Sequence, residues 1–285
     1  MAKIVRKKEL NPSVTLLEVE APKVAKRALP GQFIILRIDE EGERIPLTIA
    51  DFDRVKGTIT IIFQKVGLTT QLLGSLNLGD EIRDFVGPLG KATEIGKNTK
   101  KICVVGGGVG CAIAYPQAKY LHQSGREVDV IAGFRSRDIV ILEDEFQKAC
   151  SRFFLTTDDG SYGEKGFVTD KLKNLIDTGN AYDLVIAIGP IPMMRFVAKT
   201  TEPYGIETLV SLNPIMVDGT GMCGGCRVTV GGQVKFACVD GPDFDGHAVD
   251  FDELMNRNGI YREQEAAARK IHACRLETMG RTMIR

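Results

Sequence analysis

The sequence lacks a net charge and has no long hydrophobic run. Its 37 basic and 37 acidic side chains cancel, and no local cluster of lysine and arginine departs from that balance. Such a chain has no electrostatic attraction for nucleic acid or anionic lipid, so neither is expected as a partner. No apolar run approaches the roughly 18 residues that a membrane-spanning helix needs, and residues 1–10 are too polar for a signal peptide. We therefore expect a cytoplasmic protein.

Histidine is scarce, with three in 285 residues. His122 and His272 fall on segments with helical spacing, where packing in the core or on the surface explains them. Neither is accompanied by the serine and aspartate that would form a catalytic triad. We therefore assign neither histidine a catalytic role.

The seven cysteines are odd in number and unevenly spread, unlike the disulfide framework of a secreted protein. We expect four of them to be structural, because a small apolar thiol packs well in a core. These four are Cys103, Cys111, Cys150 and Cys274. The other three, Cys223, Cys226 and Cys238, lie close together and call for a different explanation.

A length of 285 residues with 44% hydrophobic content allows two or three compact domains. Residues 1–98 carry alternating, β-branched runs between Pro, Gly and Asp turns, which predict the strands of an antiparallel β-barrel. The six runs are residues 3–10, 14–21, 32–39, 44–51, 57–66 and 80–90. A helical insert at residues 68–76 has Thr69 and Thr70 where an N-cap is expected, and its first amides suit a phosphate.

From residue 99 strands, glycine turns and helices alternate. Continuous apolar strands such as residues 184–188 are typical of a parallel sheet covered on both faces, so we predict a doubly wound domain over residues 99–211. Residues 212–250 are rich in Gly, Cys and Asp and too poor in large apolar residues to fold on their own core. Residues 251–285 are charged with helical spacing and predict a helical tail. The expected fold class is β plus α/β.

A glycine cluster follows the first strand of the α/β domain and opens a helix. Glycine there lets backbone amides and the helix N-terminus approach a pyrophosphate, although a tight turn without a ligand would look the same. Its members are Gly106, Gly107, Gly108 and Gly110. The acidic residue that usually ends the second strand and binds a ribose is missing. Asp129 lies too early in that strand to reach a ribose. Arg135 and Arg137 follow instead, so local residues do not separate NAD from NADP.

A barrel strand carries a second motif, in which an arginine can pair with a diphosphate while a proline-restrained backbone and a hydroxyl address a flat polar ring. It consists of Arg44, Pro46, Leu47 and Thr48. An exposed strand arginine alone would look the same. The barrel also offers Gly67, Thr69 and Thr70 at a helix start and a Gly-Pro-Leu-Gly loop at residues 87–90. This combination favours a ligand site.

A third motif, residues 189–194, follows the strand at residues 183–188. It lies at the carboxyl edge of the parallel sheet, where open α/β sheets bind ligands. Pro190 and Pro192 also suit the first turn of a helix. Both explanations are compatible.

The strongest pattern is Asp218-x4-Cys223-x2-Cys226-x11-Cys238 on a glycine-rich segment. Plant-type ferredoxins use a similar cysteine spacing, with cysteine where this chain has aspartate. We predict a 2Fe-2S cluster held by three thiolates and one carboxylate. A structural zinc site with Asp218 or His247 as the fourth ligand is the main alternative. A glycine-rich turn with free thiols is the other.

These motifs occur in the order found in the ferredoxin-NADP reductase superfamily, which residues 3–245 resemble. The likeness is greatest to the branch with dihydroorotate dehydrogenase electron-transfer subunits. Those subunits have cysteine at the first cluster-ligand position. Asp218 departs from them and instead resembles the small subunits of NADH-dependent reduced ferredoxin:NADP oxidoreductase, also known as sulfide dehydrogenase subunits.

The resemblance implies an FAD on the barrel, NAD(H) on the α/β domain and a 2Fe-2S cluster in the C-terminal region. The implied FAD residues are Arg44, Pro46, Leu47, Thr48, Phe63, Gln64, Gly67, Thr69 and Thr70. The implied NAD(H) residues are Gly106, Gly107, Gly108, Gly110, Gly133, Phe134, Arg135, Gly189, Pro190 and Met193. The implied cluster ligands are Asp218, Cys223, Cys226 and Cys238.

The implied activity is hydride transfer between nicotinamide and flavin, followed by single-electron transfer to the cluster and a partner. The implied partner is a larger subunit with a second flavin, 4Fe-4S clusters and an NADP(H) site, through which ferredoxin is reached. Whether electrons are bifurcated stays open. Three alternatives remain: an electron-transfer subunit of dihydroorotate dehydrogenase, a hydrogenase-associated diaphorase subunit and a non-catalytic, zinc-stabilised nucleotide-binding scaffold.

Overall fold

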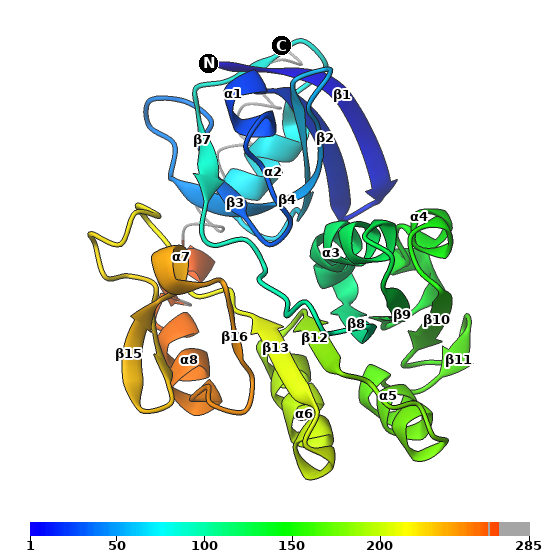
Figure 1. The fold of residues 1–285 in the computed structure, drawn as a ribbon. Coiled ribbons are helices and arrows are strands. Elements are labelled where there is room, and N and C mark those ends of the chain that lie inside the picture. The colour runs from blue at the N-terminus through cyan, green and yellow to red at the C-terminus, as the bar shows by residue number, and fades with distance from the viewer. Residues whose placement is uncertain (262, 268–285) are drawn as a thin grey trace.

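The computed structural model describes residues 1–261 and 263–267. Two sheets of seven strands and a two-stranded hairpin form the framework (Figure 1). Most of the expected helical tail, with His272 and Cys274, lies outside the described residues. Within the described part, no helix is both long and apolar enough to cross a membrane.

The N-terminal sheet is an antiparallel barrel, as predicted. Its strand order is β6-β1-β2-β5-β4-β3-β7. The strands are β1 (Ala2–Asn11), β2 (Val14–Glu20), β3 (Phe33–Arg37), β4 (Ile45–Asp53), β5 (Thr58–Gln64), β6 (Glu81–Ile82) and β7 (Asp84–Leu89). β6 and β7 lie at opposite ends of this order, yet only Arg83 separates them in the chain. The sheet therefore closes on itself, which protects its edges from pairing with other chains.

The sixth sequence run differs from the prediction of one strand. Residues 80–90 form both β6, which pairs with β1, and β7, which pairs with β3. The expected loop at residues 87–90 is largely the end of β7. A Cβ on Gly87 would lie 2.7 Å from the Ile34 side chain, so glycine here allows close packing of the two strands.

Helix α1 (Pro22–Ala25) and helix α2 (Leu68–Ser75) connect barrel strands. The N-cap of α2 is Gly67, so the expectation that Thr69 or Thr70 caps this helix was wrong. Thr70 lies one turn further on, and its hydroxyl accepts hydrogen bonds from the amides of Val66 and Gly67. The threonine stabilises the same helix end from inside the helix.

The second sheet has the order β11-β10-β9-β8-β12-β13-β16. Its central strands are parallel, as the doubly wound prediction requires. They are β8 (Lys101–Gly107), β9 (Glu127–Phe134), β10 (Arg152–Thr157), β12 (Leu184–Ile188) and β13 (Glu207–Ser211), with the short β11 (Glu164–Lys165) at one edge. The chain order reverses between β8 and β12, which creates a topological switch point.

Helices cover both faces of this sheet (Figure 1). α3 (Cys111–Gln123) and α4 (Glu143–Lys148) pack on one face and form a core with alternate residues of β8 and β9. α5 (Val168–Asp177) and α6 (Ile191–Thr201) pack on the other. The apolar runs are continuous because both faces of each strand are buried.

The C-terminal region does not stand apart from this sheet. β16 (Asp243–Asp245) pairs antiparallel with β13 and extends the sheet at its edge. The remaining elements are the hairpin β14 (Arg227–Val230) and β15 (Gln233–Phe236), with α7 (Ala237–Asp240) and α8 (Phe251–Asn258). These elements share one core with α5, α6 and two barrel residues, Phe33 and Ile35. The shared core supplies the hydrophobic support that residues 212–250 lack by themselves.

Candidate functional site

The carboxyl ends of β9, β8 and β12 meet at the switch point. Gly133 on β9 lies beside Gly107 on β8, and Gly106 lies beside Ile188 on β12. The 3-10 turn Gly108–Gly110 then leads into α3. The structure thus brings the glycine cluster, the end of β9 and the turn after β12 together, as the sequence predicted.

The glycines at this point have two different roles. A Cβ on Gly110 would lie 2.5 Å from the carbonyl oxygen of Ile188 and 2.7 Å from the Cα of Gly189, so glycine is needed for the approach of two backbones. Gly108 has φ +56°, and a Cβ there would meet nothing within 4 Å. Gly108 therefore leaves open space at the start of a helix, where a pyrophosphate would fit.

Several of the predicted nucleotide-binding residues pack within the domain. Met193 lies against the glycine turn. A Cβ on Gly107 would be only 2.3 Å from its Sδ. Gly133 makes room for the Val168 side chain of α5, and Phe134 is buried in the core. Any contact of Gly133 or Phe134 with a ligand would therefore come mainly from the backbone.

Asp129 is fully buried in β9, in agreement with the expectation that it lies too early to reach a ribose. It accepts hydrogen bonds from Arg152 Nε at 2.9 Å and from the Tyr182 hydroxyl at 2.6 Å. Arg135, at the end of β9, is exposed. The guanidinium of Arg137 lies 5.2 Å from the centroid of the Tyr162 ring.

The two faces of β4 differ. Leu47 packs against the barrel core, whereas Pro46 and Thr48 lie opposite Ile35 and Phe33 of β3 and share their outward face. Arg44, just before the strand, is exposed. The arginine, proline and threonine of the motif are thus available to a ligand outside the barrel, while Leu47 can offer only its backbone.

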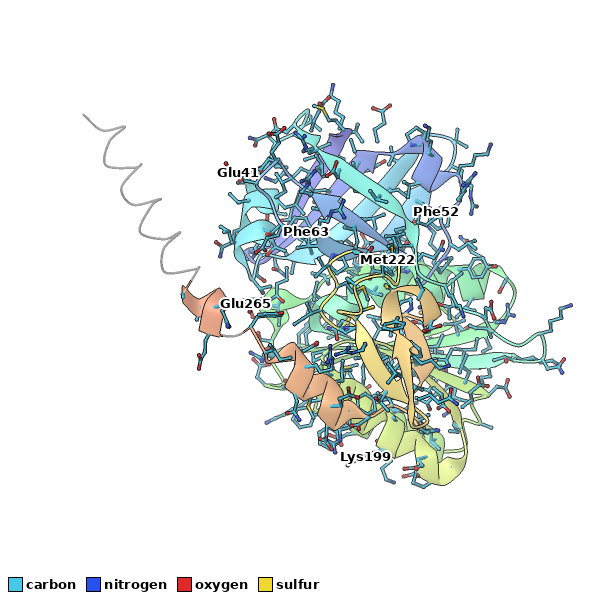
Figure 2. All side chains as sticks on the ribbon, turned by 90° about the vertical axis from the view of Figure 1, so that its left-hand side faces the viewer. Glu41, Phe52, Phe63, Lys199, Met222 and Glu265 are labelled. Atoms are coloured by element: carbon cyan, nitrogen blue, oxygen red, sulfur yellow. The ribbon has the colours of Figure 1, made fainter. Side chains whose placement is uncertain are left out.

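A similar division holds at the end of β5. Phe63 is buried within the barrel (Figure 2), and Gln64 is exposed. At the adjacent start of α2, a Cβ on Gly67 would meet nothing within 4 Å. The Thr69 hydroxyl donates to Glu43 at 3.1 Å, which ties α2 to the residue before Arg44. The first amides of α2 have no partners within the helix and suit a phosphate.

The cluster loop, residues 218–226, supplies Asp218, Cys223 and Cys226, and α7 supplies Cys238. Cys226 Sγ and Cys238 Sγ are 3.2 Å apart and form no disulfide. Asp218 Oδ2 accepts a hydrogen bond from the amide of Cys223 at 3.3 Å. A 2Fe-2S cluster takes two protein ligands on each iron. The close pair of Cys226 and Cys238 and the soft thiolate donors fit such a cluster.

The loop also supplies hydrogen bonds to its sulfurs and to Asp218. The amide of Gly225 donates to Cys223 Sγ, and the amide of Cys238 donates to Cys226 Sγ, each at 3.5 Å. Burial, with the neighbouring Cys226 thiol, raises the pKa of Cys238 to about 12. The hydrogen bond from Thr220 is the main cause that lowers the pKa of the Asp218 carboxyl.

One version of the zinc alternative uses His247 as its fourth ligand. Within residues 1–261 and 263–267, no three His, Cys, Asp or Glu side chains are grouped so that they could hold one metal ion. His247, the other fourth ligand considered for zinc, lies against α6 with Nε2 3.0 Å from the Thr201 hydroxyl. A structural zinc needs four donors around one ion. The position of His247 therefore counts against that version of the zinc site.

The cluster loop packs on the barrel next to the β4 motif. A Cβ on Gly219 would lie 2.6 Å from Ile35 Cδ1 and 3.0 Å from Leu89 Cδ1. Ile35 is the strand partner of Pro46. Met222, which is 88% exposed, lies where the loop meets the barrel (Figure 2). The cluster donors and the predicted flavin strand are therefore neighbours.

The remaining described cysteines are structural, as expected. Cys103, Cys111 and Cys150 are buried free thiols. Burial raises the pKa of Cys111 to about 12 and that of Cys150 to about 11. Burial of this kind favours the unreactive thiol form over the thiolate.

Sequence reasoning missed a polar cluster between the three regions. The buried carboxylate of Asp243 on β16 accepts hydrogen bonds from Thr93, before β8, and from Gln117 on α3. It also missed Lys119, which pairs with Asp51 on β4, and Thr220, which donates to Asp218. Of these contacts, only that between Asp218 and Thr220 could have been predicted from neighbouring residues. Aspartate and threonine side chains often form hydrogen bonds with groups two residues away.

Comparison with known proteins gives a consistent result. The family model for the iron-sulfur cluster binding domain of dihydroorotate dehydrogenase B matches residues 213–250. The chain is 48% identical, over 92% of each sequence, to the dihydroorotate dehydrogenase B (NAD(+)) electron transfer subunit homolog of Thermotoga maritima. It is 35% identical to the corresponding electron transfer subunit of Fusobacterium nucleatum, over 75% of this chain and 83% of that one.

A solved structure shows the same likeness over almost the whole chain. It comes from work on flavin-based electron bifurcation and the structure of the NADH-dependent reduced ferredoxin-NADP oxidoreductase. The TM-score is 0.90 at 45% sequence identity, and the match covers 96% of this chain and 98% of that one.

Proposed function

This chain belongs to the family of dihydroorotate dehydrogenase B electron-transfer subunits and their homologues, and from that premise we propose that it carries electrons between NAD(H), an FAD and a 2Fe-2S cluster. We assign it to the ferredoxin:NADP oxidoreductase type within the family. The family and the fold class expected from the sequence motifs are confirmed. The roles of individual residues, and the domain boundaries at residues 98, 211 and 250, stay predictions.

One observation carries the proposal: β4 lies between the other two cofactor regions. On one side, Asp51 of β4 pairs with Lys119 of α3, the helix that follows the glycine turn. On the other side, Pro46 of β4 pairs with Ile35, on which Gly219 of the cluster loop packs. A flavin held outside β4 would therefore face both the nicotinamide nucleotide and the cluster.

When bound, the FAD supplies a centre that exchanges a hydride with nicotinamide and single electrons with an iron-sulfur cluster. This chain supplies the geometry. Arg44 and the first amides of α2 would bind the diphosphate, and the outward face of Pro46 and Thr48 would position the ring. The Gly67 backbone leaves room at the helix start. We name no proton donor for this step, because hydride transfer depends on geometry rather than on an acid or base.

The glycine turn and the strand ends would hold NAD(H). Gly108 and the start of α3 would bind the pyrophosphate, and Gly110 keeps that turn against Gly189. Arg135 would contact the adenosine end of the nucleotide. The turn at Gly189 and Pro190, with Met193 above Gly107, would position the nicotinamide end.

The donors Asp218, Cys223, Cys226 and Cys238 would hold the cluster. Three are thiolates, which suit iron-sulfur clusters, and cluster formation would displace their protons. The exposure of Cys223 and Met222 supports a position near the protein surface for this end of the proposed electron path.

We propose that the partner is a larger subunit with a second flavin, 4Fe-4S clusters and an NADP(H) site, and that ferredoxin is reached through it. The exposed apolar side chains of Met222 and Val217, beside the cluster donors, support a docking face there. Free thiols and an iron-sulfur cluster suit a reducing compartment, so we propose a cytoplasmic location.

The electron-transfer subunit of dihydroorotate dehydrogenase is the second candidate, because a relative with that name is 35% identical. The carboxylate at position 218 and the 45% identity over nearly the whole chain favour the first candidate. Purification from the native cell separates the two, since the partner that co-purifies would carry either 4Fe-4S clusters or a dihydroorotate site.

The cofactors are tested by purifying the chain without oxygen and assaying flavin, iron and sulfide. We expect one FAD and two irons per chain, with flavin and iron-sulfur absorbance bands that bleach on addition of NADH. A colourless chain without flavin or iron after anaerobic reconstitution would contradict the proposal. Zinc in such a chain would favour the zinc-stabilised scaffold.

A further inference from the structure

The two oxygens of the Asp218 carboxylate have different partners. Oδ2 accepts hydrogen bonds from the amides of Met222 and Cys223, at 3.2 and 3.3 Å. Oδ1 accepts a hydrogen bond from the hydroxyl of Thr220. The carboxylate is thus fixed in orientation from both ends by its own loop.

Counting lone pairs distinguishes the two oxygens. Each carboxylate oxygen has two lone-pair positions. Oδ2 accepts from two amides, whereas Oδ1 accepts from the Thr220 hydroxyl. Oδ1 is therefore the less heavily hydrogen-bonded oxygen and the better placed to bind iron, and it would do so while still accepting the threonine hydroxyl.

The loop backbone holds Thr220 in this position. The glycines on either side have left-handed conformations, with φ +78° at Gly219 and +86° at Gly221. Gly219 packs on Ile35 of the barrel, and a Cβ on Gly221 would lie 3.1 Å from the Val239 side chain. Both glycines are needed for these close approaches, so the threonine between them has little freedom to move away from Asp218.

We propose that Thr220 is a positioning residue that keeps Asp218 a one-oxygen ligand and raises the reduction potential of the cluster. This inference rests on the proposed function, in which Asp218 binds iron. A hydrogen bond to a ligand atom withdraws negative charge from it and so stabilises the reduced cluster relative to the oxidised one. Partners that orient a metal ligand in this way also strengthen metal binding.

The test measures the midpoint potential and the EPR spectrum of the reduced cluster in the full chain. Thr220→Val removes the hydroxyl, and Thr220→Ser keeps it. We expect the valine variant to have a more negative potential and altered g-values, and the serine variant to match the parent. A change on the order of tenfold in the redox equilibrium corresponds to ~59 mV for one electron.

A double variant tests whether the effect passes through the carboxylate. In an Asp218→Cys background the acceptor oxygen is gone, so Thr220→Val should change the potential much less than in the parent. Thr229→Val, on β14 of the same region, is the matched control for a threonine-to-valine change. It should leave the potential unchanged.

Loss of the cluster in a variant is also informative. If Thr220→Val and Thr220→Ala both lose iron while Thr220→Ser retains it, the hydroxyl is needed to hold the ligand, as proposed. Loss of iron in the serine variant, or an unchanged potential and spectrum in a valine variant that retains its cluster, would overturn the inference. A parent chain without iron would overturn the proposed function itself, and this inference with it.

Discussion

Lys119 on α3 donates hydrogen bonds to both carboxylate oxygens of Asp51 on β4, at 3.0 and 2.7 Å. The pair joins the α/β domain to the barrel strand that we assign to the flavin. Burial alone would lower the pKa of Lys119, but the hydrogen bond and charge of Asp51 raise it overall. A lysine with a raised pKa stabilises the fold below its unfolded pKa and loses that effect only as the pH rises through the folded pKa. The contact therefore persists at physiological pH.

Replacing this lysine tests the alignment of the two domains. Lys119→Met should lower the free energy of unfolding by only about 0.5–1 kcal/mol, because both side chains are partly exposed. It should slow flavin reduction by NADH on the order of tenfold, since small misplacements of reacting groups are costly. Stopped-flow absorbance measures this rate.

Lys173→Met is the matched control for that variant. Lys173 forms an ion pair with Asp177 within α5 and touches neither the barrel nor the switch point. It should leave the rate of flavin reduction unchanged. Equal rates in the Lys119 variant and the parent would show that this pair does not align the domains.

Gly108 tests the nucleotide site with little effect on folding. Both Gly108 and Gly125 have positive φ, +56° and +84°, and a Cβ at either would meet nothing within 4 Å. Alanine at either position should therefore cost a similar amount, about 1 kcal/mol of stability. Only Gly108→Ala should raise the KM for NADH, because its methyl group would enter the space assigned to the pyrophosphate. If Gly125→Ala raised the KM equally, the effect would not come from that space.

Asp243 makes the stability of the protein depend on pH. Burial raises the pKa of its carboxyl, and the hydrogen bonds from Thr93 and other side chains only partly oppose this. Asp243 Oδ1 and Gln117 Oε1 are both buried without a hydrogen-bond partner. Because the folded state binds this proton more tightly than the unfolded state, the contribution of Asp243 to stability falls as the pH rises from the unfolded pKa to the folded pKa.

Asp243→Asn removes the carboxylate charge. Its side-chain amide also supplies a hydrogen-bond donor beside the buried acceptors that lack a partner. We expect the variant to gain about 1 kcal/mol of stability relative to the parent at pH 8. The gain should be smaller at pH 4 than at pH 8, because the raised pKa makes the parent carboxyl take up its proton at a higher pH than an ordinary aspartate. Denaturant unfolding at the two pH values measures this difference. A variant that is less stable than the parent at pH 8 would contradict it.

The order and type of the main elements could be predicted from the sequence, because each depends on a local pattern. The run at residues 184–188 is apolar throughout and becomes β12, buried on both faces. The glycine cluster likewise predicted the turn that leads from β8 into α3. These features need only neighbouring residues to specify them.

Contacts between distant segments could not be predicted in the same way. Thr93 and Asp243 are 150 positions apart, and nothing near either residue indicates the other. The attachment of β16 to β13 and the closure of the barrel at Arg83 also depend on pairing between remote strands. The N-cap of α2 was misplaced for a local reason, since Thr70 can stabilise a helix start from its first turn as well as from the cap position.

The central claim is that electrons pass from the nicotinamide nucleotide through the flavin on β4 to the cluster held by Asp218 and the three cysteines. Anaerobic stopped-flow mixing of the full chain with NADH, with freeze-quenched samples examined by EPR, tests it most directly. We predict that the flavin absorbance bleaches first and that the signal of a reduced 2Fe-2S cluster follows. Cluster reduction that precedes flavin bleaching, or a cluster that stays oxidised after the flavin is reduced, would contradict the account.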